Sequence, residues 1–104
     1  MKTYNTIEEV KADIKDGVLA VNESVTFNFS LTIEANLKIA GDINAGDINA
    51  MNIDAGDINA RDINAGDIQF YAVAFAYTSF ACKSIMSRRE PSKFFCLDSE
   101  VKFK

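Results

Sequence analysis

Five aspartates recur five or ten residues apart in the middle of the chain, and they are its candidate partner-binding residues: Asp42, Asp47, Asp57, Asp62 and Asp67. Carboxylates in such a series can ligate a metal, act as a general acid and base, or imitate the phosphates of a nucleic acid. Each of the five directly precedes an isoleucine. Whatever element places the isoleucines therefore also places the carboxylates.

Metal and acid-base chemistry are the weaker hypotheses for these aspartates. The spacing of a calcium loop is broken, because Gly46 precedes Asp47 and no glutamate closes a twelve-residue loop. The chain has no histidine, which removes the usual base for a serine or cysteine nucleophile. Solvated carboxylates also lack the environment that shifts a pKa for catalysis. We expect no catalytic residues, no metal, no cofactor and no enzymatic activity. Two explanations of the five aspartates remain. They are corner residues that bond nearby backbone groups, or they form a rod of negative charge that a partner recognises.

The isoleucines repeat with a period of five through "AGDINAGDINAMNIDAGDINARDINAGDIQF", residues 40–70. In a helix, a step of five advances by about 140°, so the isoleucines would scatter around the cylinder. In one continuous strand they would alternate between the two faces, because five is odd. A bend in every repeat brings them all into one core.

The sequence therefore predicts a mainly β protein, a short β-solenoid in which each coil pairs with the next. Each Ile-Asn-Ala is expected to be a short strand with Ile and Ala inside and Asn outside. Gly-Asp is expected to form the corner, glycine being suited by its backbone freedom, although Met51 and Arg61 replace it in two repeats. At the same spacing the alanines give way to larger residues, which predicts an inward column extending to residue 85: Phe70, Phe75, Phe80 and Ile85.

Two segments, Thr78-Ser79-Phe80 and Val73-Ala74-Phe75, come nearest to a motif of a small residue, then Asp or Asn, then Leu or Phe, then two variable positions. The chain resembles the pentapeptide-repeat family, whose fold is a right-handed, four-sided β-helix. The "INAGD" units depart from the motif, with Ile in the small position and Ala in the large one. The resemblance implies a coil of twenty residues, with Asp42 above Asp62 and Asp47 above Asp67. The residues themselves leave the cross-section open.

The ends of the chain are predicted to close a single domain of residues 1–104, with residues 40–85 as the solenoid. Thr6 followed by Glu9 is a helix-start signature, and Gly17 is a stop, so residues 1–17 are expected to hold a capping helix. Residues 18–39 alternate apolar and polar residues as irregular first coils. Residues 86–104 are expected to form a C-terminal cap, as a hairpin, a final strand or a dimer contact. The family resemblance implies dimerisation through C-terminal ends, which keeps a homodimer open.

Charge is unevenly divided along the chain. Residues 1–69 hold twelve acids and five bases, which is a net charge of −7. Residues 70–104 hold three acids and six bases, which is a net charge of +3, so the whole chain has a net charge of −4. An acidic body favours basic partners and disfavours direct binding of nucleic acid. No apolar run approaches the length of a membrane span, so we expect a soluble, intracellular protein with Cys82 and Cys96 reduced.

A second resemblance extends over most of the chain. The opening "MKTYNTIEEVKADIKDGVLAVNESVTF", the "GDINA" array and the segment "FYAVAFAYTSFACKSIMSRREPSK" are similar to small proteins of phages and mobile elements of Firmicutes that include an anti-CRISPR of type II-A. The resemblance implies a non-enzymatic inhibitor that acts in the bacterial cytoplasm on Cas9 or its guide-RNA complex, without contacting a membrane. Two alternatives stay open, namely a duplex mimic that acts on DNA gyrase and a structural or assembly module.

Overall fold

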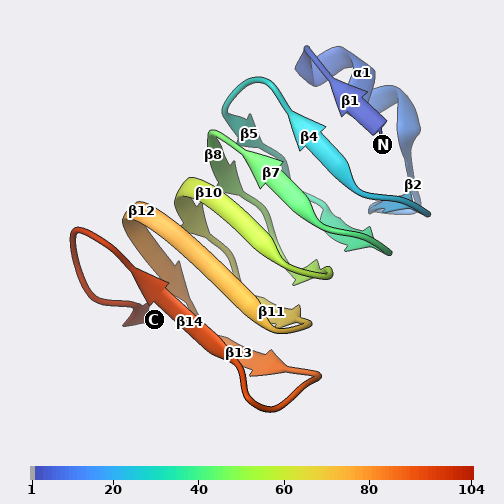
Figure 1. Cartoon of the computed structure of the whole chain (residues 1–104). Helices are drawn as coiled ribbons and strands as arrows, with labels where there is room; N and C mark the ends of the chain where they lie inside the picture. The colour runs from blue at the N-terminus through green and yellow to red at the C-terminus, as the bar shows by residue number, and fades with distance from the viewer. Residues whose placement is uncertain (1) are drawn as a thin grey trace.

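The computed structural model describes residues 2–104, and these residues wind into a β-solenoid of about five turns. The strands of these coils lie on three faces, so the molecule is a three-sided prism. The strands of the first face lie side by side along the length of the molecule in Figure 1. All pairs are parallel except β2 with β3. The predicted solenoid is confirmed.

The three faces are built as follows. The first face contains β1 (Lys2–Tyr4), β4 (Val25–Phe27), β7 (Ile43–Ala45), the first part of β10 (Ile58–Asn64), the first part of β12 (Val73–Cys82), and β14 (Lys93–Cys96). The second face contains β5 (Leu31–Thr32), β8 (Asp47–Asn49), the second parts of β10 and β12, and β15 (Lys102–Phe103). The third face contains β2 (Ile14–Lys15), β3 (Val18–Val21), β6 (Asn36–Ile39), β9 (Ile53–Asp54), β11 (Asp67–Phe70) and β13 (Ser84–Ser87).

One coil of the repetitive segment is three five-residue units long. Ile58 pairs with Ile43, and Ile63 pairs with Ile48, so residues fifteen apart are stacked. The twenty-residue coil implied by the family resemblance is therefore wrong for this chain. The physical reason lies in the core, because alanine takes the place of the family's Leu or Phe and supplies too little volume to fill a wider interior.

The inward and outward positions of the array are as predicted. All six isoleucines of the series are 1% exposed, and the asparagines between Ile and Ala are exposed. Phe70 and Phe80 are buried, but the prediction for Phe75 is wrong, since its ring lies on the outer surface. The coil lengthens here, so that Ile58 pairs with Ala74, sixteen residues on. The extra residue turns Phe75 outward and Ala74 inward.

At three of the four glycine corners of the array, those of Gly41, Gly56 and Gly66, neighbouring coils approach so closely that a Cβ would clash. Gly17 is the one glycine with a positive φ, so backbone freedom is not what the array glycines supply. A Cβ on Gly56 would lie 2.8 Å from the carbonyl oxygen of Gly41 in the coil before. A Cβ on Gly46 would meet its nearest atom, the Phe29 carbonyl oxygen, at 3.7 Å. The corner at Gly56 therefore has no room for a side chain, whereas the corner at Gly46 has room for one.

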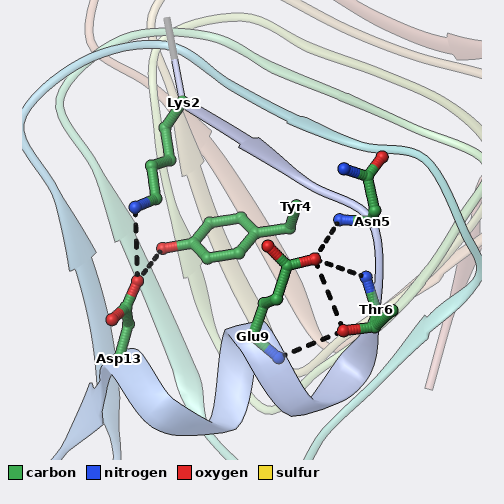
Figure 2. Close-up of polar contacts among 6 residues, drawn as sticks. All are labelled: Lys2, Tyr4, Asn5, Thr6, Glu9 and Asp13. Carbon is green, nitrogen blue, oxygen red and sulfur yellow. Dashed lines mark hydrogen bonds and ion pairs between the residues drawn. The ribbon is translucent and has the colours of Figure 1, made fainter.

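Helix α1 (Ile7–Asp13) closes the N-terminal end of the solenoid (Figure 1). Its predicted capping box is present, with the Glu9 amide donating to Thr6 Oγ1 and the Thr6 amide donating to Glu9 Oε1 (Figure 2). Val10 is fully buried against the first coils, and the Tyr4 hydroxyl donates to Asp13 Oδ2 at 2.7 Å. Burial, with the Asp13 carboxylate beside it, raises the pKa of Tyr4. The helix thus covers the first coil with both apolar and polar contacts.

The C-terminal residues continue the stack, and they do not fold back as a hairpin. β14 pairs in parallel with the first part of β12, and β15 pairs in parallel with the second part. Of the hairpin and the final strand, the final strand is therefore correct, whereas the dimer contact stays a prediction. The helix lies at the other end of the molecule, so the last coil has no corresponding cover among residues 2–104 (Figure 1).

Candidate functional surface

The five candidate aspartates are divided among three edges of the prism. Asp42 and Asp57 occupy the edge before the first face, and Asp47 pairs with Asp62 at the edge before the second. Asp67 lies on the third edge, aligned with Ser84. The expected stacking of Asp42 on Asp62 and of Asp47 on Asp67 is wrong, because the coil has fifteen residues. The carboxylates therefore do not form one continuous rod.

On the first edge the carboxylates bond the backbone of the next coil. Asp42 Oδ1 accepts a hydrogen bond from the Asp57 amide at 2.8 Å, and Asp57 Oδ1 accepts from the amides of Ala72 and Val73 at 3.0 Å each. On the third edge Asn52 Oδ1 does the same for the Asp67 amide at 2.9 Å. These side chains satisfy amides that turn away from the strands at corners, which is the structural explanation that the sequence left open.

On the second edge Arg61 neutralises part of the acidic charge. Its Nε and Nη2 donate to the two oxygens of Asp47 at 2.9 and 2.7 Å, a bidentate geometry. Ser30 Oγ donates to the same carboxylate at 3.1 Å. The hydrogen bond from Arg61 is the main reason that the pKa of Asp47 is lowered. Arg61 thus offsets the repulsion between the stacked Asp47 and Asp62.

The outer surface of the first face changes from polar to aromatic along the axis. One outward ladder, read from the N-terminal to the C-terminal end, contains Thr3, Thr26, Asn44, Asn59, Phe75 and Phe95. The Phe75 ring centroid lies 4.6 Å from that of Tyr77 and 4.7 Å from that of Phe95. Val73, Tyr77 and Phe95 are 38%, 49% and 41% exposed. We call these four side chains, Val73, Phe75, Tyr77 and Phe95, the aromatic patch.

The aromatic patch borders the acidic first edge. A shallow groove on this face is lined by Asp42, Asn44, Asp57 and Asn59 together with Val73, Phe75 and Phe95. Contiguous exposed apolar side chains with a polar rim are typical of protein-binding surfaces, and aromatic residues contribute strongly to binding energy at such surfaces. The groove therefore offers apolar contact beside carboxylate and amide acceptors.

Sequence reasoning missed the aromatic patch because it extended the period of five through residue 75. A different signal was present in Val73-Ala-Phe-Ala-Tyr77, where large side chains alternate with alanine. This is the period of a strand with one face directed inward and the other outward. Counting that alternation puts Ala74 and Ala76 on the opposite face from the large residues, and the structure shows that the alanines face the core.

Other classes of site are sparse in residues 2–104. The described side chains contain no group of three or more His, Cys, Asp and Glu residues that could hold a metal ion. Within the same residues no helix is long and apolar enough to cross a membrane. Comparisons with protein-family models, with curated proteins and with solved structures find no significant match to the chain.

Proposed function

We propose that the chain is a non-enzymatic inhibitor that binds type II-A Cas9 or its guide-RNA complex through the aromatic patch and the acidic first edge. The observation that supports this proposal is the cluster of Val73, Phe75, Tyr77 and Phe95 on a face that is otherwise polar. The target comes from the resemblance to small phage proteins. The structure supplies the candidate contact surface, which is an aromatic patch beside the carboxylates of Asp42 and Asp57.

The charges beside the patch suit a basic partner. Asp42 and Asp57 line the same groove as Phe75. A protein channel that holds nucleic acid is rich in Lys and Arg, and a negative rim attracts such a surface before the aromatic side chains are buried. Asp47, Asp62 and Asp67 lie on other edges, and Asp47 is already paired with Arg61. We therefore assign the contact to Asp42 and Asp57 rather than to all five.

The surface charge is sparser than that of a nucleic-acid duplex. Coils follow one another at about 4.8 Å, whereas a duplex carries one charge per roughly 1.7 Å of axis. The proposal therefore depends on apolar contact with an acidic rim and does not require close imitation of a phosphate backbone.

A Cas9 cleavage assay tests both the target and the surface. The triple variant Phe75→Thr, Tyr77→Thr, Phe95→Thr keeps residues that favour strands while it removes the patch. The control is Asn49→Thr with Asn64→Thr, outward residues of the second face. We expect the native chain and the control to inhibit cleavage, and the triple variant to need at least about tenfold more protein, since each buried aromatic contact is worth on the order of 1 kcal/mol or more.

Two results would reject the proposal. Undiminished cleavage at a large molar excess of the native chain removes Cas9 as the target. Equal inhibition by the triple variant, with unchanged circular dichroism, removes the aromatic patch as the contact surface. A parallel supercoiling assay with DNA gyrase examines the duplex-mimic alternative, and light scattering examines assembly into larger particles.

The acidic rim is tested separately with Asp42→Asn and Asp57→Asn. Asparagine keeps an oxygen that can accept the corner hydrogen bonds, as Asn52 does on the third edge. The double variant should therefore fold normally and bind Cas9 more weakly. Its affinity should also depend less steeply on salt than that of the native chain. Unchanged affinity and an unchanged salt slope would exclude these two carboxylates from the contact.

A further inference from the structure

The last coil leaves three strand edges and part of the core uncovered. Within residues 2–104, β13, β14 and β15 each pair with a single strand, so their outer edges have no partner strand there. Phe94 and Phe103 occupy inward positions, aligned with Ala74 and Cys82 of the coil before. Ala74 and Cys82 are fully buried, whereas Phe94 is 40% and Phe103 57% exposed. The difference arises because, within residues 2–104, no coil lies over the two aromatic rings.

We propose that the C-terminal coil binds an extended segment of a partner protein, which adds one parallel strand to the edge of β14. The segment would carry an acidic residue over Lys93 and apolar residues over Phe94 and Cys96. Addition of a strand to a sheet edge supplies backbone hydrogen bonds, and alternate side chains supply specificity.

The hydrogen-bond pattern of β14 leaves the required groups free for such a strand. The amides of Lys93 and Leu97 donate to the carbonyl oxygens of Ala72 and Ala76 in the coil before. Successive residues of a strand direct their backbone groups to opposite sides, so the amides and carbonyls of Phe94 and Cys96 point away from β12. An added parallel strand would bond these two residues.

The side-chain alternation along β14 sets the composition of the bound segment. Lys93 and Phe95 lie on the outer surface, and Phe94 and Cys96 lie toward the interior. Phe94 packs edge to face with Phe70 beneath it at 6.3 Å and with Phe103 beside it at 6.4 Å. Residues stacked directly over one another on a sheet interact, so the matching sequence is Glu over Lys93, Val over Phe94, Tyr over Phe95 and Val over Cys96.

The charge of the last coil favours an acidic partner over a second copy of the chain. Residues 86–104 hold five bases and three acids, and the exposed lysines are Lys93 in β14, Lys102 in β15 and Lys104 directly after β15. A second copy would bring the same net positive segment to the contact, so it lacks the complementary charge that an acidic segment supplies. The N-terminal end of another copy is covered by helix α1 (Figure 1). A heterologous acidic segment meets neither obstacle.

The inference does not depend on Cas9, so its test uses synthetic peptides and the isolated full chain. The probe is a short peptide that contains Glu-Val-Tyr-Val, with Lys-Val-Tyr-Val as the charge control and Glu-Pro-Tyr-Val as the control that cannot form a regular strand. Binding is measured by fluorescence anisotropy. Amide hydrogen exchange of Phe94 and Cys96 is followed by NMR. We expect the acidic peptide to bind about five- to tenfold more tightly than the lysine peptide, and to slow exchange at both amides.

The variant Lys93→Glu provides the matched control, because Lys93 is exposed and outside the core. It should reverse the preference so that the lysine peptide binds more tightly. Equal binding of the acidic and lysine peptides, unchanged exchange at Phe94 and Cys96, or an unchanged preference in Lys93→Glu would each overturn the proposal. So would a stable dimer in solution that already protects these two amides, since the occupant would then be a second copy.

Discussion

Two glycines in identical sequence surroundings should respond oppositely to alanine. Gly46 and Gly56 each stand in the phrase Ala-Gly-Asp-Ile-Asn-Ala. In Gly56→Ala the new Cβ would lie 2.8 Å from the Gly41 carbonyl oxygen, so the backbone must shift. The Gly56 amide donates to that same oxygen at 2.7 Å, and the neighbouring Asp57 amide donates to Asp42. Overpacking of this kind costs about 1–3 kcal/mol, and the strained hydrogen bonds place this variant toward the upper end.

Gly46→Ala should instead be neutral or slightly stabilising. Its Cβ would be 3.7 Å from the nearest atom, an ordinary contact, and its φ is not positive. Alanine restricts the unfolded chain and stabilises by about 0.4–1 kcal/mol at such a position. Urea denaturation should therefore separate the two variants by about 3 kcal/mol. Thermal midpoints should differ by more than about 10 °C in a domain of this size. Equal shifts in the two variants would refute the account of the corners.

Three further predictions concern the salt bridge, the core and the cysteines. Arg61→Gln should destabilise the protein near neutral pH and have little effect in strong acid. The reason is that the lowered pKa of Asp47 stabilises the fold above about pH 4, and this contribution is lost as the pH falls through that lowered pKa. Urea denaturation at both pH values measures the effect, and equal destabilisation at the two pH values would contradict it. Ile58→Ala should cost about 2–5 kcal/mol because Ile58 is 1% exposed, whereas Asn59→Ala, on the outer surface, should change the stability by less than about 1 kcal/mol. Cys82 and Cys96 are both free thiols. A thiol reagent should label half-buried Cys96 in the native protein but Cys82 only after unfolding, since burial raises the pKa of Cys82 and blocks access of the reagent. Rapid labelling of Cys82 in the native protein would be inconsistent with its place in the core.

The solenoid could be predicted because its evidence is local. A spacing of five places a corner in every repeat, and Thr6 with Glu9 marks the start of the helix. The number of corners in a coil depends instead on how the interior fills. The isoleucine spacing is the same for fifteen or twenty residues per coil, so the stacking of the aspartates did not follow from it.

The aromatic patch could not be located from the periodic array alone. One additional residue between Ile58 and Ala74, relative to the coil before, moves Phe75 from the expected inward position to the surface. The roles of Asp42 and Asp57 were likewise ambiguous in the sequence, since a carboxylate that bonds a corner amide and one that meets a partner occupy the same position. In the structure they bond the next coil and also line the groove.

Hydroxyl-radical footprinting of the native chain with guide-loaded Cas9 tests the proposed contact most directly, because it reports the solvent exposure of individual side chains. Met51, 55% exposed at a corner between the second and third faces, serves as the internal reference. We predict that labelling of Phe75, Tyr77 and Phe95 falls when Cas9 is added, while labelling of Met51 stays the same. Unchanged labelling of the three aromatic residues, or a decrease at Met51 alone, would contradict the proposed binding surface.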